Sequence, residues 1–248
     1  MYSIFLIILS IPVAILAALV FDAFAATLGL KISKGNISTD PLTFGSNTKK
    51  LRYLILGDST AAGVGADYKQ GIAILTSQHI SENYLVEMNN YSVSGARVKD
   101  ILDDQIKRSQ NIIPDLVLIS IGGNDVTHFS KLEEVKNNFD KVIQNLQSRN
   151  LYIKIVITGS PDVGTAFRVM QPLRFVYGIQ SKRINKIFES FIEKYHLTLA
   201  SIYGGTRKAF KNNSELFSED KFHPNEKGYK IWVDVLNKGI DKALSNNP

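Results

Sequence analysis

Three residues in this chain have the types and spacing that nucleophilic catalysis needs. Ser59 follows an apolar run and a glycine, and the segment 220–224 carries Asp220 three residues before His223. A serine hydroxyl is a weak nucleophile at neutral pH until a base takes its proton, and an imidazole, with an ordinary pKa of about 6.5, suits that task. A carboxylate then orients the ring and stabilises its charged form. We therefore expect Ser59 to be the nucleophile, His223 the base and Asp220 the group that orients His223.

Hydrogen-bond donors for a developing oxyanion can also be identified. The backbone N–H of Ser59, expected at the start of a helix, is one candidate, and the N–H of Gly95 is a second because glycine lets a ligand approach the backbone closely. The side-chain amide of Asn124 is the third. Losing one such donor typically costs about 2.7–4 kcal/mol of transition-state stabilisation, so a hydrolase needs them placed together.

The elements that must position these residues alternate between strands and helices. Short apolar runs that are typical of buried parallel strands occupy residues 51–56, 116–121, 153–158 and 197–202, with a weaker candidate at 91–94. Amphipathic patterns with a helical period occupy residues 98–108, 132–146, 179–195 and 227–244. This alternation predicts an α/β fold, a three-layer α/β/α sandwich around a parallel sheet. Function gathers at the carboxyl ends of such strands, where Ser59, Gly95 and Asn124 all fall.

Four short blocks taken together resemble the SGNH hydrolase superfamily, also called GDSL-type esterases and lipases. The blocks are GDST with Ser59, SVSGAR with Gly95, GGND with Asn124, and DKFHP with Asp220 and His223. The resemblance covers roughly residues 51–244.

The resemblance implies a flavodoxin-like parallel sheet of about five strands and ester hydrolysis without a metal or other cofactor. It also implies an oxyanion hole made from Ser59, Gly95 and Asn124. Two features depart from the family pattern. Thr60 stands where leucine is common, and the block around Gly95 is short and the least diagnostic of the four.

The N-terminal segment is apolar and without charge from residue 4 to residue 21. As a helix this run is roughly 27 Å long, close to the hydrocarbon thickness of a bilayer. The sequence Ala23-Phe24-Ala25 resembles a signal-peptide cleavage site, but the run is longer than an ordinary signal core, and we favour a retained anchor. We expect an anchor or signal segment over 1–30, a polar tether over 31–50 and the hydrolase domain over 51–248.

The side of the membrane follows less directly from the sequence. Lysines and Arg52 follow the apolar run while no basic residue precedes it, which by the positive-inside rule favours a cytoplasmic domain. Exported hydrolases nonetheless carry such leaders, and we favour an anchored, extracytoplasmic domain that would be secreted if the segment were cleaved.

Composition excludes several function classes. The chain of 248 residues has no cysteine, which removes disulfides, thiolate nucleophiles and cysteine metal sites. Its net charge of +6 comes from scattered lysines and arginines, so we expect no nucleic-acid partner and only a mild preference for anionic lipid. The histidines at 79, 128 and 196 lack metal-ligand spacing, although His128 could line the substrate cleft.

The expected reaction is hydrolysis of an acyl ester through an acyl-enzyme. Residues 166–179 mix aromatic, apolar and basic side chains, and they form either a helix packed on the sheet or an apolar wall over an acyl pocket. The second reading favours a lysophospholipid, another lipid or a small acyl ester as substrate, with an O-acetylated carbohydrate or cell-wall glycan as the alternative. Two rivals remain, a catalytically silent tethered binding domain and an acyltransferase.

Overall fold

In the computed structural model, which describes Ala17 and residues 40–245, the central strand is β2 (Lys50–Gly57). Its residues 51–56 are apolar on both faces except for Arg52, so the strand is stable only between two covering layers. It lies in a six-stranded sheet of order β1-β3-β2-β4-β5-β6. The other strands are β1 (Leu42–Phe44), β3 (Leu85–Asn90), β4 (Leu116–Ser120), β5 (Lys154–Ile157) and β6 (Thr198–Leu199).

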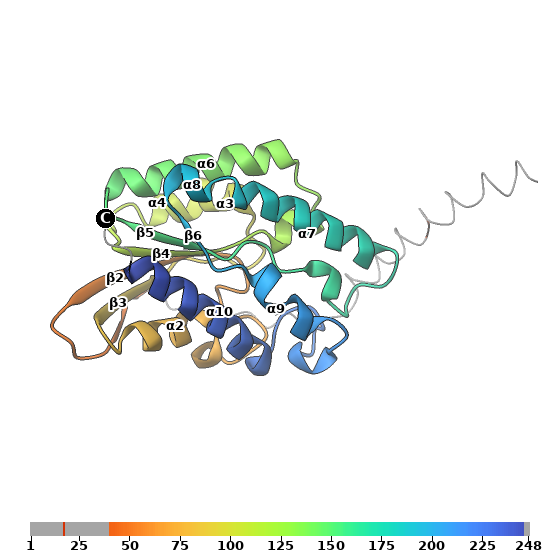
Figure 1. Ribbon diagram of the computed structural model, residues 1–248, viewed down its shortest axis with the longest axis horizontal. Coiled ribbons are helices and arrows are strands. Elements are labelled where there is room, and N and C mark those ends of the chain that lie inside the picture. Colours follow the sequence, from red (N-terminus) through yellow and green to blue (C-terminus); the bar gives the residue numbers. More distant parts are fainter. Residues whose placement is uncertain (1–16, 18–39, 246–248) are drawn as a thin grey trace, which may run out of the picture.

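Strands β2 to β6 pair in parallel, and β1 adds to β3 in the antiparallel direction at one edge. The helices lie in two layers, with α6 and α7 over one face of the sheet and α2 and α10 over the other (Figure 1). The predicted α/β/α sandwich with five parallel strands is therefore confirmed, with one antiparallel strand added.

The longer helices are α2 (Ile72–Ile80), α6 (Leu132–Arg149), α7 (Leu173–Glu189), α9 (Ile202–Phe210) and α10 (Glu226–Ser245). Shorter α-helical segments are α3 (Val98–Asp100), α4 (Ile106–Arg108), α5 (Gly123–Thr127) and α8 (Ile192–Tyr195). A π-helical turn, η2 (Ile101–Gln105), joins α3 to α4. Single 3₁₀ turns are η1 (Tyr68–Gln70), η3 (Val163–Thr165) and η4 (Ser214–Leu216).

Alternate residues of each strand supply two separate cores. Leu54 and Leu56 belong to the first core, which packs against α6 and α7. Tyr53 and Ile55 belong to the second core, which packs against α2 and α10. All four side chains are fully buried. The period of two in a parallel strand thus produces two hydrophobic cores from one apolar run.

The structure corrects two expectations about the elements. The weak strand expected at 91–94 is wrong: the third strand is β3, whose Glu87, Asn89 and Asn90 hide its apolar pattern, and residues 91–94 continue from its end as a loop. The segment 31–50, expected to be a polar tether, contains β1, because Leu42 and Phe44 are partly buried against the core below α2 and α10.

The predicted membrane anchor lies outside the described residues. Within residues 40–245, no helix has both the length and the apolar character needed to cross a bilayer.

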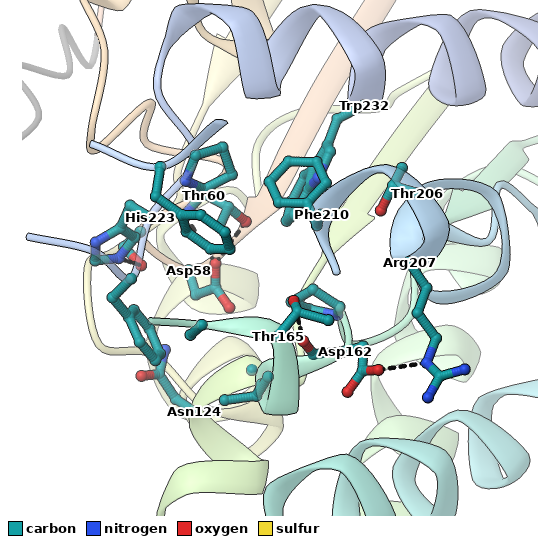
Figure 2. Close-up of a pocket in the computed structure, with 18 residues that line it drawn as sticks. Asp58, Thr60, Asn124, Asp162, Thr165, Thr206, Arg207, Phe210, His223 and Trp232 are labelled. Atoms are coloured by element: carbon teal, nitrogen blue, oxygen red, sulfur yellow. Dashed lines mark hydrogen bonds and ion pairs between the residues drawn. The ribbon is translucent and has the colours of Figure 1, made fainter. Parts of the chain in front are cut away.

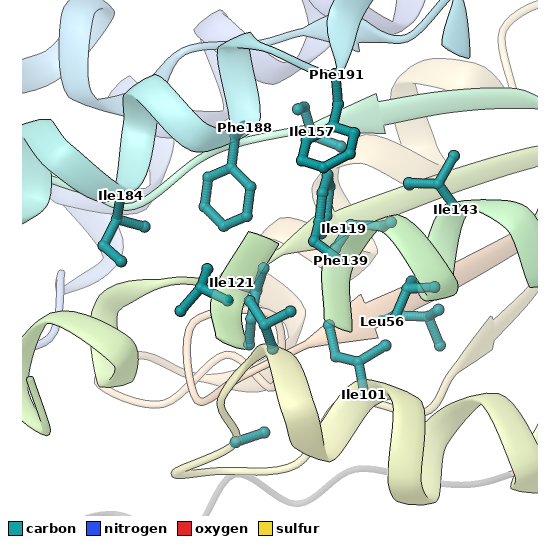
Figure 3. Close-up of a cluster of buried hydrophobic side chains, with 14 of the residues drawn as sticks. Leu56, Ile101, Ile119, Ile121, Phe139, Ile143, Ile157, Ile184, Phe188 and Phe191 are labelled. Carbon is teal, nitrogen blue, oxygen red and sulfur yellow. The ribbon is translucent and has the colours of Figure 1, made fainter. Parts of the chain in front are cut away.

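Aromatic packing concentrates the first core around Phe139 of α6. Its ring contacts those of Phe188 and Phe191 edge-on, with centroid distances of 4.7 Å and 5.4 Å (Figure 3). Phe139 is fully buried, so truncating it would leave a cavity that its neighbours can fill only in part.

We predict that Phe139→Ala lowers the free energy of unfolding by about 3–5 kcal/mol, as measured by urea denaturation. Phe175→Ala is the matched control, because the Phe175 side chain is 66% exposed and should cost little. Equal losses in the two variants would contradict this account of the core.

Candidate active site

Ser59, His223 and Asp220 form a continuous hydrogen-bonded line. Ser59 Oγ lies 2.8 Å from His223 Nε2, and His223 Nδ1 lies 2.5 Å from Asp220 Oδ2. The carboxylate is an acceptor, so Nδ1 carries a proton and donates to it. Nε2 of the neutral ring is then free to accept the proton of the Ser59 hydroxyl. All three residues are at most 6% exposed, so little water competes for these bonds.

Asp220 is held as an anion by more than its histidine. Its Oδ1 accepts hydrogen bonds from Ser218 Oγ at 2.7 Å, from Phe222 N at 2.8 Å and from His223 N at 2.9 Å. Burial raises the pKa of the Asp220 carboxyl, but the hydrogen bonds and the charge interaction with His223 outweigh it and hold that pKa well below its ordinary value. The carboxylate is therefore charged and fixed in orientation at neutral pH.

The loop that carries His223 and Asp220 is closed on itself before α10 begins. An isolated bridge pairs Phe217 with Pro224, and Ser218 N donates to His223 O at 2.8 Å. Tyr229, in the first turns of α10, donates from its hydroxyl to Val64 O at 2.6 Å. These bonds tie the C-terminal loop to the segment that follows Ser59.

Ser59 follows a tight passage out of β2 at Gly57. Gly57 has φ +156°, and a Cβ there would lie 2.1 Å from the Ser120 carbonyl oxygen, so only glycine fits. Asp58 N donates to that same oxygen at 3.0 Å, and Val64 N donates to Ser59 O at 2.9 Å. The residues after Ser59 form successive hydrogen-bonded turns, rather than the regular helix that we expect from the sequence.

The side chain of a buried glutamine, Gln105, holds the backbone at Gly57 in place. Gln105 Oε1 accepts from Gly57 N, and Gln105 Nε2 donates to Gly57 O, both at 2.8 Å. Gln105 is fully buried and ends the π-helical turn η2. Single π-helical turns recur at functional sites, and here one presents an amide side chain to the backbone two residues before Ser59.

Two of the predicted oxyanion donors lie on segments that are bonded to each other, Gly95 on the loop after β3 and Asn124 in α5. Asn124 Nδ2 donates to Ala96 O at 3.0 Å, and Asp125 Oδ2 accepts from Val98 N at 3.0 Å. Gly95, beside Ala96, has φ +84°, a left-handed conformation that favours glycine. One N–H of the Asn124 amide holds the Gly95 loop, which leaves the other available to a ligand.

A pocket opens beside Ser59 with a cavity volume of about 50 Å³. Ser59, Asn124 and His223 line it, whereas Gly95 does not. Its wall includes four aromatic side chains from the C-terminal loop and the helices on either side of it, namely Phe210, Phe217, Phe222 and Trp232. In Figure 2, His223 and Asp58 lie at one side of this pocket and the ion pair of Asp162 with Arg207 at the other.

Two further acids at the site have altered acidity. Burial raises the pKa of Asp58 from 3.8 to about 6, although hydrogen bonds from Thr60 and the charge of His223 oppose the rise. Burial likewise raises the pKa of Asp125, against the hydrogen bond from Val98 N. Both acids accept hydrogen bonds that hold the adjoining backbone in place, Asp58 from Thr60 and Asp125 from Val98.

The other histidines take no part in the pocket. His79 Nε2 lies 2.7 Å from Asp241 Oδ1, and His196 adopts φ +53° after α8. His128 is exposed and contacts Asn124 O through Nδ1 at 2.8 Å, outside the pocket lining.

Several residues of the site were not identifiable from the sequence. Gln105 and the pair Asp162–Arg207 belong to no motif, and Phe210 and Trp232 read only as core residues. The stretch 166–179 divides between the two readings: Ala166 lines the pocket, and residues from Leu173 onward begin α7.

Comparison with known proteins finds a family and relatives that this chain resembles. A sequence model of the GDSL-like lipase/acylhydrolase family matches residues 55–231. A GDSL-like esterase of Mycobacterium tuberculosis is 24% identical over 199 residues, covering 77% of this chain and 62% of that protein. The esterase TesA of Pseudomonas aeruginosa is 28% identical over 136 residues, covering 50% of this chain and 62% of that protein. The alignments thus span less than two thirds of both relatives.

A solved structure shares the fold. The esterase EstA from Pseudoalteromonas sp., in a structure inhibited by monoethylphosphonate, superposes with a TM-score of 0.62 at 22% identity. The superposition covers 79% of this chain and 99% of that one.

We predict that Gln105→Leu lowers both stability and turnover. The change removes the partner of the buried Gly57 N–H, and an unsatisfied buried group costs about 1–3 kcal/mol. The free energy of unfolding, measured by urea denaturation, and the rate of labelling of Ser59 by a fluorophosphonate should both fall. The control Gln110→Leu, at an exposed position, should change neither quantity. A normal labelling rate in Gln105→Leu would show that the glutamine does not position the serine.

The raised pKa of Asp58 predicts how the stability of the fold depends on pH. Because its folded-state pKa is raised, the folded protein binds more protons than the unfolded chain between pH 3.8 and about 6. Its contribution to stability is present below that window and is lost as pH rises through it, by roughly 3 kcal/mol in total. Asp58→Asn removes this slope and keeps the acceptor for Thr60.

Urea denaturation at several pH values should therefore show wild type losing stability relative to Asp58→Asn as pH rises from 3.8 to about 6. The exposed Asp103→Asn serves as the control and should keep the wild-type slope. Parallel pH profiles for wild type and Asp58→Asn would contradict a raised pKa of Asp58 in the folded protein.

Proposed function

This chain belongs to the GDSL-like lipase/acylhydrolase family, whose members are serine ester hydrolases, and we propose that it cleaves acyl esters through a covalent acyl-enzyme. The observation that carries the proposal is the line from Asp220 through His223 to the Ser59 hydroxyl, which ends at the wall of an apolar pocket. This arrangement meets the requirement that a nucleophile, its base and the base's orienting group be within hydrogen-bond reach.

In the proposed mechanism, Ser59 Oγ attacks the ester carbonyl carbon while its proton passes to His223 Nε2. The N–H groups of Ser59 and Gly95 and the free N–H of Asn124 stabilise the oxyanion of the tetrahedral intermediate. The intermediate then collapses, the C–O bond breaks and the alcohol leaves with the proton from His223. Water, deprotonated by His223, attacks the acyl-Ser59 ester, and the acid is released as Ser59 recovers its proton.

The pocket favours a short acyl group. An engineered apolar cavity of about 150 Å³ just accepts benzene, and the cavity beside Ser59 has about 50 Å³. Its aromatic lining suits an apolar chain of a few carbons, and a long chain would have to leave it. Small acyl esters, including O-acetyl groups on carbohydrate, therefore fit better than the long-chain lipids that the stretch 166–179 favours in the sequence.

We predict that Ser59→Ala reduces ester hydrolysis by more than about 10⁴-fold and leaves the fold intact, because the hydroxyl is the attacking group. The measurement is the rate of p-nitrophenyl ester hydrolysis for acyl groups from acetyl to palmitoyl, with circular dichroism as the check on folding. Ser190→Ala, an exposed serine at the end of α7, is the matched control. Activity should peak at the short acyl groups.

Each outcome separates the candidate functions. Serine-dependent activity that peaks at palmitoyl would support a lipid substrate and would contradict the size argument. Absence of serine-dependent activity at every length, with no fluorophosphonate labelling, would support the catalytically silent binding domain. Ester formation with an added alcohol in preference to hydrolysis would identify an acyltransferase.

A further inference from the structure

A second cavity begins where the pocket beside Ser59 ends. It is a groove of about 550 Å³ lined by residues of α7 and α9 and by the loops around them. Asp162, Thr165 and Arg207 line both cavities, so the two are adjacent. In Figure 2 this boundary lies across the pocket from His223.

The groove carries an excess of positive charge. Four of its lining side chains are cationic, namely Arg174, Lys182, Arg207 and Lys211. Among the described residues that line it, Asp162 is the one acid, and it is already paired with Arg207. A concave surface with charge of one sign raises the local concentration of oppositely charged ligands.

The cations differ in how they are held. Arg174 donates from Nε to Gly164 O at 3.1 Å and from Nη2 to Thr165 O at 3.3 Å, which fixes both the loop and the guanidinium. Within the described part of the chain, Lys182 and Lys211 make no ion pair, and both are exposed. Two fixed guanidinium groups and two adaptable ammonium groups thus surround one groove.

Arg207 lies at the boundary between the two cavities, and its ion pair with Asp162 uses one side of the guanidinium. Its Nε donates to Asp162 Oδ2 at 2.5 Å, and the Asp162 side chain is 5% exposed whereas that of Arg207 is 51% exposed. Figure 2 shows the terminal nitrogens of Arg207 beyond this bond, on the side away from the pocket. A guanidinium presented in this way matches the geometry of a carboxylate or phosphate.

We propose that this groove binds an oxyanion, a carboxylate or phosphate carried by the ester substrate beyond the group that fills the pocket. The inference rests on the proposed function and adds a preference for anionic esters to it. Neutral esters gain nothing from the groove. The role of the groove is therefore measured by the preference for anionic over neutral esters, and not by the rate with neutral esters.

The test compares pairs of esters with the same reacting ester group, in which one member carries an added acid group. One pair carries the charge on the acyl side, p-nitrophenyl butyrate against p-nitrophenyl hydrogen glutarate. The other pair carries it on the alcohol side, butyrylglycerol against butyrylglycerol phosphate. The variant is Lys182→Glu with Lys211→Glu, and the control is Lys238→Glu with Lys242→Glu on α10, which changes the net charge equally.

We expect wild type to prefer the anionic member of at least one pair and the groove variant to lose that preference by tenfold or more, mainly through KM. The neutral esters should change less than twofold, and the control should behave as wild type. The preference should also weaken as ionic strength rises from about 0.01 M to about 1 M, where the Debye length shortens from about 30 Å to about 3 Å.

A binding measurement keeps the proposal testable without turnover. Titration calorimetry of glutarate and of glycerol phosphate into Ser59→Ala should show binding that the two lysine changes abolish. No binding of either anion, or no preference in either pair, would overturn the groove. Hydrolysis of neutral esters without any anionic preference would overturn the groove alone, whereas loss of all serine-dependent hydrolysis would overturn the proposed function.

A last comparison identifies the source of the anion. Vesicles with and without phosphatidylglycerol are sedimented with wild type and with the groove variant. Retention on the anionic vesicles that the lysine changes abolish, together with a preference for butyrylglycerol phosphate, would assign the oxyanion to lipid headgroups, whereas an anionic preference without retention would assign it to a soluble ester.

Discussion

The geometry of the site depends on how the chain leaves β2 at Gly57. At this residue the backbone passes against the Ser120 carbonyl of β4 so closely that no side chain fits. The Gln105 amide bonds to both the N–H and the C=O of Gly57, and Asp58 N donates to Ser120 O. The serine that follows is therefore fixed by its backbone to the centre of the sheet, and the imidazole has a target that does not move.

The residues that carry the proposed chemistry could be predicted because each lies in a short sequence motif. Ser59 and Asn124 follow the two most apolar runs, β2 and β4, which are adjacent in the sheet. The pair Asp220 and His223 is local in sequence, so its spacing already determines its contact. The strand before Gly95 was not predicted, because it buries two polar side chains, Asn89 and Asn90, and the bond from Asn90 to Ala61 O in a distant loop has no signal in the alternation of apolar residues.

Features that arise from contacts between distant segments had no sequence signal. The pocket wall joins Phe210 of α9 to Trp232 of α10, and both are ordinary core residues in their own helices. In the sequence, Gln105 cannot be distinguished from any other glutamine in an amphipathic helix. Only the π-helical turn η2 directs its side chain toward Gly57. Arg207 and Asp162 are 45 positions apart, and their pairing depends on how α9 docks beside η3.

The distance along the chain between Ser59 and His223 has a consequence for folding. The two residues are 164 positions apart, and the hydroxyl of Tyr229 closes the same gap with Val64. Contacts of such long range form late, because their loop-closure entropy is repaid only when most of the chain is ordered. During synthesis Ser59 emerges long before His223, so under the proposed mechanism the nascent chain lacks its base until the C-terminal loop reaches its place beside Ser59.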